Sequence, residues 1–226
     1  GVAGAFTALE LGPGDSLASA LVVSGLGGGS CWLVDAGDFA RKDMDIYRSI
    51  AAHLRSRGIT VPDLGNVADA PAMLSQCRAR YLTNGLAGLR AIPDSSVDFI
   101  WSQAVLEHVR KHEFADTMKE LRRVLKTNGA WSHRIDLRDH LSAGLNNLRF
   151  SDRFWEGEFF ASSGFYTNRI SFAEMLTIFK TAGFRVDIGQ VDRWNVPPLP
   201  RGKMARQFQQ RTADDLVVSG FNVVLR

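Results

Sequence analysis

The fold is decided by residues 8–16, which read ALELGPGDS. The apolar residues up to Leu11 predict a buried strand, and the glycines Gly12 and Gly14 predict a tight turn into a helix. Glycine lets the backbone approach a ligand closely, and the start of a helix offers unpaired N–H groups. This stretch therefore predicts a strand–turn–helix unit with a ligand at the turn.

The next predicted strand, residues 31–34, ends at Asp35. An acid at the end of the second strand of such a fold can accept hydrogen bonds from both hydroxyls of an adenosine ribose. The two glycines and Asp35 together predict a cofactor that contains adenosine. The alternative is that Gly12 and Gly14 only make a turn and that Asp35 only caps a loop.

The residues around the glycine pair distinguish between adenosine cofactors. A dinucleotide site favours G-x-G-x-x-G, but Leu17 stands at the position of the third glycine. Glu10, two residues before Gly12, would repel a pyrophosphate and would suit the cationic sulfonium and ammonium groups of S-adenosylmethionine. The sequence therefore favours S-adenosylmethionine, with S-adenosylhomocysteine as its product, over NAD.

Strands and helices alternate along the chain, which predicts an α/β fold, a Rossmann-like three-layer sandwich. The predicted strands are 6–11, 31–34, 80–83, 97–102, 130–135, 184–191 and 216–225. The predicted helices are 16–24, 44–57, 70–78, 104–125 and 171–182, with turns at 84–85 and 127–129. Residues 194–215 hold three prolines and few apolar residues. We expect no crossover helix there, so the last strand should return antiparallel, between the fifth and sixth strands of a mostly parallel seven-stranded sheet.

Length and composition exclude several classes of protein. The 226 residues fit one domain, 1–226, and the net charge of +3 is dispersed, so no nucleic-acid partner is expected. No apolar run reaches the length of a membrane span, and no basic residues precede the first apolar run, so we expect neither membrane insertion nor a signal peptide. Cys31 and Cys77 have no disulfide or metal-ligand pattern, which favours the cytoplasm.

Several motifs, in order, resemble the type 11 methyltransferase domain of the class I S-adenosylmethionine-dependent methyltransferases. ELGPGDS resembles motif I, and LVDAGDFA resembles the acidic motif of the second strand. IPDSSVDFIWSQAVLEHV resembles the fourth-strand motif, and ELRRVLKTNGAWSH resembles the following helix and the fifth strand. The resemblance covers residues 8–133 and implies methyl transfer from S-adenosylmethionine to an acceptor.

The resemblance also implies further cofactor contacts. Beside Glu10, Gly12, Gly14 and Asp35, it adds residues that would lie near the methionine, the ribose or the adenine: Pro13, Ala36, Asn84, Gly85, Leu86, Gln103 and Ala104. The family often has an acid in the adenine loop, where this chain has Asn84. Asn84 or neighbouring backbone would replace that contact.

A hydroxyl acceptor would benefit from a general base, for which histidine is the usual choice. His140 follows the polar end of the fifth strand, where Asp136 or Asp139 could orient its ring, and His108 lies near the end of the fourth strand. We predict His140, His108 and Asp136 as catalytic, although His108 could be a packing residue and the polar strand end an ordinary solvated loop. His133 lies within the strand and is expected to be buried. We expect no metal site.

Residues 141–170 form an insertion that is rich in aromatic residues: Phe150, Phe154, Trp155, Phe159, Phe160, Phe165 and Tyr166. The insertion could form a lid over the acceptor, with Trp155 supplying binding area, or a small helical subdomain with its own core. The predicted acceptor is a small molecule with an oxygen or nitrogen nucleophile, and saccharide and lipid precursors are the candidates. The alternatives are a catalytically inactive binding protein of the same fold, a nucleic-acid methyltransferase and an NAD-type oxidoreductase.

Overall fold

The computed structural model describes residues 5–226, and the chain divides into two compact units. Unit 1 holds the described part of Gly1–Ser102 together with Arg123–Trp131. Unit 2 holds Gln103–Arg122 and Ser132–Arg226. That the whole chain acts as one domain stays a prediction.

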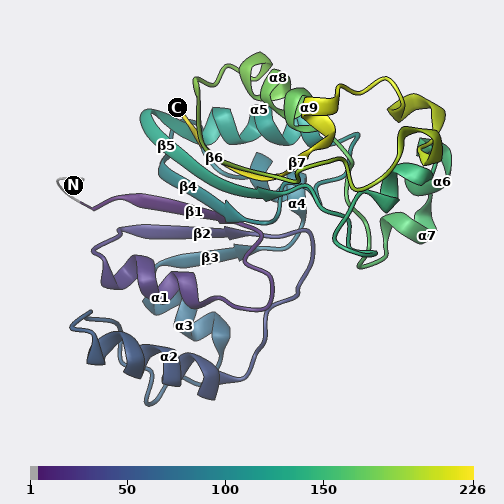
Figure 1. Cartoon of the computed structure of the whole chain (residues 1–226). Coiled ribbons are helices and arrows are strands. Elements are labelled where there is room, and N and C mark those ends of the chain that lie inside the picture. The colour runs from purple at the N-terminus through teal and green to yellow at the C-terminus, as the bar shows by residue number, and fades with distance from the viewer. Residues whose placement is uncertain (1–4) are drawn as a thin grey trace. The chain divides into compact units, whose positions relative to one another are not determined.

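The seven strands form one sheet in the order β3-β2-β1-β4-β5-β7-β6 (Figure 1). They are β1 Thr7–Leu11, β2 Ser30–Val34, β3 Ala79–Leu82, β4 Val97–Gln103, β5 Leu125–Asp136, β6 Val186–Arg193 and β7 Val218–Leu225. Strand β1 pairs in parallel with β2 and β4, and β2 pairs in parallel with β3. Strand β7 lies between β5 and β6 and is antiparallel to β6. The predicted Rossmann-like α/β fold is confirmed, as is the antiparallel last strand between the fifth and sixth strands.

In unit 1, α1 Ala18–Gly25 and α3 Ala70–Gln76 lie on one face of β1, β2 and β3, and α2 Met44–Ser56 packs against α1 farther from these strands (Figure 1). Asp43 and Asp69 cap α2 and α3 by accepting backbone N–H groups of the first turn. The core between these helices and the sheet includes Leu21, Leu33 and Met73, which are fully buried.

Unit 2 combines short helices with two longer amphipathic helices, α8 Phe172–Thr181 and most of α5 Phe114–Val124. The short elements are η1 Asn146–Arg149, α6 Asp152–Trp155, α7 Glu158–Ala161, η2 Arg201–Lys203, η3 Arg206–Phe208 and α9 Ala213–Leu216. The predicted capping box of α8 is present, because the Ser171 and Glu174 side chains bond each other's backbone N–H groups. Only η2, η3 and α9 connect β6 to β7, which agrees with the missing crossover helix and the antiparallel return.

The fourth crossover differs from its prediction. The sequence predicts one helix over 104–125, but α5 spans only Phe114–Val124. Ala104 has a φ of +52°, which a continuing helix does not allow. The Asn168 side chain also takes the carbonyls of Leu106 and Val109 as acceptors, so these groups do not serve a helix.

Two predicted turns are also wrong. Residues 127–129 lie within β5, and a Cβ at Gly129 would come 3.0 Å from the carbonyl oxygen of Asp98, so glycine there permits close strand packing. Residues 84–85 begin a short helix, α4 Gly85–Arg90, in which Gly85 takes a φ of +50°.

Candidate active site

The turn between β1 and α1 has the geometry that its glycines predict. Gly12 and Gly14 have φ values of +72° and +61°, in the left-handed region that favours glycine. The Gly12 N–H donates to the carbonyl of Val34, which ties the turn to the end of β2. A Cβ built on Gly14 would meet no protein atom within 4 Å, so open space lies beside this backbone. Pro13 sits between the two glycines and is half-buried.

Asp35 joins this turn to two further loops. One carboxylate oxygen, Oδ2, accepts the Gly14 N–H at 2.9 Å, and Oδ1 accepts the Ala36 N–H at 2.8 Å. The Asp35 carbonyl accepts the Gly85 N–H at 2.8 Å, and a Cβ on Gly85 would lie 3.7 Å from the Ala36 Cα. Unit 1 therefore brings together the β1–α1 turn, the end of β2 and the start of α4. Asn84, exposed, and Leu86, half-buried, flank Gly85 there.

Glu10 lies near the end of β1 with part of its carboxylate unsatisfied. Its Oε1 accepts the Trp101 indole N–H at 3.2 Å, whereas Oε2 is buried without a hydrogen-bond partner. Burial raises the pKa of Glu10, against hydrogen bonds from Ser19 and Trp101 that lower it. A buried carboxylate oxygen without a donor is costly, and an ammonium or hydroxyl group of a ligand would satisfy it. Glu10 therefore fits a cationic cofactor better than a phosphate.

Gln103 and Ala104 belong to unit 2. Gln103 is exposed at the end of β4, and the N–H of Ala104 donates to the carbonyl of Arg134 in β5 at 2.9 Å. The positive φ of Ala104 turns the chain sharply after the strand.

Unit 2 brings the two predicted catalytic histidines together. The rings of His108 and His140 lie edge to face with their centroids 4.9 Å apart. The His108 Nδ1 lies 2.9 Å from the Tyr166 carbonyl oxygen, and the His140 Nδ1 lies 3.1 Å from the Gly164 carbonyl oxygen. A carbonyl only accepts, so each ring carries its proton on Nδ1 and, when neutral, has an accepting lone pair on Nε2. Desolvation lowers the pKa of His108, which favours this neutral form.

Asp136 has a different partner from the one that we expected. Its carboxylate binds Arg138 through two guanidinium nitrogens, at 2.6 to 3.1 Å. Burial opposes ionisation, but the hydrogen bonds from Arg138 lower the pKa of Asp136. The His140 Nδ1 is oriented by the Gly164 carbonyl rather than by this carboxylate.

His133 is fully buried in β5, as predicted, and desolvation lowers its pKa well below the usual value. Asp139, in contrast, is a structural residue. Its buried carboxylate accepts the backbone N–H groups of Leu141, Ser142 and Asn146. These bonds shape the loop that carries His140. A pocket of about 470 Å³ is lined by Asp136, Arg138, His140 and Leu141, together with neighbouring loop residues.

Glu107 is a candidate that the sequence analysis missed. It is buried, its Oε1 accepts the Asp136 N–H at 3.2 Å, and its Oε2 has no partner. Burial raises its pKa to about 8, so the carboxyl is largely protonated at neutral pH. The sequence feature that could have identified Glu107 is an acid directly before His108 in an otherwise apolar segment.

The insertion 141–170 has its own aromatic core. Trp155 is fully buried, its indole N–H donates to the Thr167 carbonyl, and its ring stacks on Phe150 and Phe160. The expectation that Trp155 offers binding area to an acceptor is therefore wrong, because no surface of it is accessible. The exposed aromatic side chains of the insertion are instead Phe154, Phe159 and Phe165.

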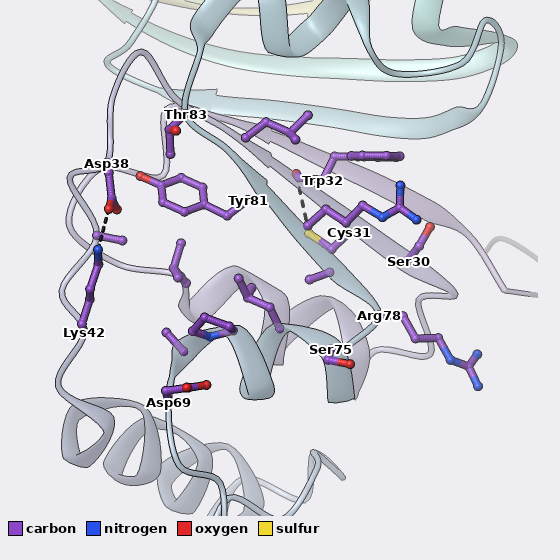
Figure 2. Close-up of a pocket in the computed structure, with 18 of the residues that line it drawn as sticks. Ser30, Cys31, Trp32, Asp38, Lys42, Asp69, Ser75, Arg78, Tyr81 and Thr83 are labelled. Carbon is purple, nitrogen blue, oxygen red and sulfur yellow. Dashed lines mark hydrogen bonds and ion pairs between the residues drawn. The ribbon is translucent and has the colours of Figure 1, made fainter.

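Unit 1 also contains a pocket of about 1040 Å³ along β2, β3 and α3, which the sequence did not predict (Figure 2). Asp38 and Lys42 form an ion pair at one end, and Ser30 and Arg78 lie at the other. None of the predicted cofactor residues lines it. Among the described residues, no group of three or more His, Cys, Asp or Glu side chains could hold a metal ion.

The order of the sheet and the loops at the ends of β1 and β2 are those of the class I methyltransferase fold. Residues 46–132 match a family model described as a methyltransferase domain.

Solved structures agree on the fold. An S-adenosylmethionine-dependent methyltransferase from Methanosarcina mazei is 17% identical with a TM-score of 0.56, over 99% of this chain and 93% of the other. One from Mesorhizobium loti is 16% identical with a TM-score of 0.52, over 99% and 91%. An arsenic(III) S-adenosylmethionine methyltransferase from Chlamydomonas reinhardtii is 16% identical with a TM-score of 0.52, over 98% and 62%.

No curated protein matches the sequence significantly. Within the described residues, no helix combines the length and the apolar character that crossing a membrane requires.

Proposed function

We propose that this enzyme transfers the methyl group of S-adenosylmethionine to an oxygen or nitrogen of a small-molecule acceptor, with saccharide and lipid precursors as candidates. The observation that carries the proposal is the hydrogen bond from the Gly14 N–H to Asp35 Oδ2. It joins the glycine turn to the acid that the ribose would need. An isolated turn or a simple loop cap would not require this link.

The residues of unit 1 would hold the cofactor in distinct ways. The backbone of Gly12, Pro13 and Gly14 would let the cofactor approach closely, because no side chain fills the space beside Gly14. Each Asp35 carboxylate oxygen accepts one backbone N–H and keeps a further lone pair for a ribose hydroxyl. The unpartnered Oε2 of Glu10 would accept from the ammonium group.

The remaining proposed cofactor contacts come from loop residues: Ala36, Asn84, Gly85 and Leu86 for the adenine, and Gln103 and Ala104 for the methionine and sulfonium. The bound cofactor supplies a methyl group on a sulfonium, whose carbon–sulfur bond breaks with its electron pair left on sulfur. The protein's main contribution is then to align the acceptor.

For a hydroxyl acceptor we propose His140 as the general base and His108 as the second candidate. Each neutral ring is held through Nδ1 and can accept a proton at Nε2. Asp136 would act through charge, since its carboxylate opposes the desolvation that lowers the pKa of His108. The insertion 141–170 would cover the acceptor as a lid on the single domain.

We further propose a cytoplasmic location, supported by Cys31 and Cys77, which are both buried free thiols. The dispersed charge supports a small-molecule acceptor rather than a nucleic acid.

Calorimetric titration with S-adenosylhomocysteine, NAD and NADP tests the cofactor, and we expect binding of S-adenosylhomocysteine alone. A screen of metabolite pools with methyl-labelled cofactor then tests the acceptor. His140→Gln should lower turnover by about 10²–10⁴ with cofactor affinity nearly intact. If only His108→Gln lowers turnover by this amount, His108 is the general base instead of His140. If both variants keep full activity, the protein contributes to the reaction only by aligning the acceptor with the cofactor.

A further inference from the structure

The two imidazoles of unit 2 are bonded to the backbone residues that precede and follow one exposed aromatic residue. The carbonyls that accept their Nδ1–H groups belong to Gly164 and Tyr166. Phe165 stands between these two residues, and 51% of its surface is exposed. The backbone segment that fixes the histidines is therefore also the segment that carries Phe165.

A second exposed apolar side chain follows His140 directly. Leu141 is 40% exposed and lines the pocket of about 470 Å³ that also contains His140. Single exposed apolar residues are normal on protein surfaces. Two of them next to a pair of proton-accepting imidazoles give a site in which a base adjoins apolar surface.

The two carboxylates around this site are already engaged. The Asp136 carboxylate is bound by Arg138, and the Asp139 carboxylate accepts the backbone N–H groups of its own loop. Recognition of a saccharide needs several free donors and acceptors that converge on its hydroxyls, because buried polar groups must be paired. The accepting Nε2 atoms of His108 and His140 suffice for one hydroxyl but not for a ring of them.

We propose that the acceptor is an alcohol whose hydroxyl is carried on an apolar body, such as an aromatic ring or a long-chain alcohol. Its body lies against Phe165 and Leu141, and its hydroxyl donates to Nε2 of one of the two histidines. The inference rests on the proposed function and narrows it to the apolar class of acceptor.

The first test measures binding without turnover. Protein saturated with S-adenosylhomocysteine is titrated by calorimetry with 2-naphthol and, separately, with methyl α-D-glucopyranoside. We expect binding of 2-naphthol alone. Phe165→Ala and Leu141→Ala should each weaken it by about three- to tenfold, the scale of a partly buried apolar side chain. Phe165→Leu should keep most of the affinity.

Leu26→Ala is the matched control for Leu141→Ala, because Leu26 is a 61% exposed leucine in unit 1. We expect no change in naphthol binding in this variant. Binding of the glucoside in preference to 2-naphthol, or equal losses in the Leu26 and Leu141 variants, would overturn the inference.

Methyl transfer separates the two proposals. Labelled product from 2-naphthol or 1-octanol, with none from the glucoside, supports both of them. Product from the glucoside alone keeps the proposed function and overturns the apolar acceptor. Failure to bind S-adenosylhomocysteine would count against the proposed function. A titration of the protein alone with 2-naphthol, on the wild type and the Phe165 and Leu141 variants, would then still decide whether these two residues form an apolar binding site.

Discussion

Asp35 combines a structural and a proposed binding role in one carboxylate. Its two oxygens accept the Gly14 and Ala36 N–H groups. We predict that Asp35→Ala weakens S-adenosylhomocysteine binding by about 1–3 kcal/mol, the scale of hydrogen bonds to a charged group. Asp35→Asn should lose less, because its amide oxygen can still accept the Gly14 N–H. Unchanged affinity in calorimetric titrations of both variants would remove Asp35 from the ribose role.

The pKa of Glu107, raised to about 8 by burial, predicts how stability depends on pH. In the unfolded chain this carboxyl returns to a pKa near 4.5, so the folded state binds the additional proton between these values. The stability that Glu107 contributes is then complete below about pH 4.5 and is lost as the pH rises towards 8. The loss should be on the order of a few kcal/mol and should level off above pH 8.

Glu107→Gln provides the comparison, since glutamine has a similar shape and does not titrate. Urea unfolding at pH 5, 6.5 and 8 should show the wild-type protein losing stability relative to the variant at each step. Parallel curves for the two proteins would mean that Glu107 is ionised throughout this range.

At the level of residues, the sequence predicted the parts of the site that depend on local backbone. Gly12, Gly14 and Asp35 were identifiable because a strand, a tight turn and an acid recur at fixed positions in such folds. The partners of Asp136 and His140 were not identifiable. Arg138 competes for the Asp136 carboxylate from two residues away, and the Gly164 carbonyl reaches His140 from a distant part of the chain.

Among the elements, the insertion depends on one buried arginine. The Arg169 guanidinium binds the Asp152 carboxylate at 2.6 Å and the Phe150 carbonyl at 2.7 Å. It also lies over the rings of Trp155 and Phe208, 5.3 and 5.0 Å from their centroids. Its side chain has no exposed surface, so the insertion and η3 share a cation that water does not reach.

We predict that Arg169→Met destabilises the protein by about 2–4 kcal/mol, because it leaves buried acceptors without their donor. Arg153→Met is the matched control: Arg153 is an exposed arginine of α6, and its replacement should change stability by less than about 0.5 kcal/mol. Chemical unfolding followed by tryptophan fluorescence measures both variants. Similar stability for the two would show that the buried guanidinium contributes no more than a surface one.

The elements that the sequence predicted well have signals within their own residues. The capping box of α8 and the apolar spacing of α2 are local, and both helices lie where expected. The predicted helix over 104–125 failed because its first part is fixed by a distant residue. The side chain of Asn168 is buried and donates hydrogen bonds to the carbonyls of Leu106 and Val109. The helical spacing of apolar residues carries no information about such a distant partner.

For the whole molecule, the direction and place of the last strand were predictable, because few topologies satisfy the rules of right-handed crossovers and short connections. The proline-rich connection between β6 and β7 is too poor in apolar residues to form a crossover helix, and this alone reverses the last strand. The division into two compact units was not predictable, because it depends on the density of tertiary contacts rather than on a linker that composition would reveal.

The last prediction concerns the stability of the whole chain. A ligand that binds only the folded state stabilises it by RT ln(1 + [L]/Kd), which is about 2.7 kcal/mol at a concentration of 100 Kd. S-adenosylhomocysteine should therefore raise the melting temperature in a concentration-dependent way, whereas NAD at equal concentration should not. In Asp35→Ala, the same S-adenosylhomocysteine concentration should give a smaller shift, because the affinity enters the logarithm. The melting curve follows global unfolding and needs no acceptor, so it tests the cofactor site independently of the acceptor. If NAD raised the melting temperature equally, the site would recognise the adenosine part of a ligand but not its sulfonium and ammonium groups. Glu10 would then have no role in binding the ammonium group.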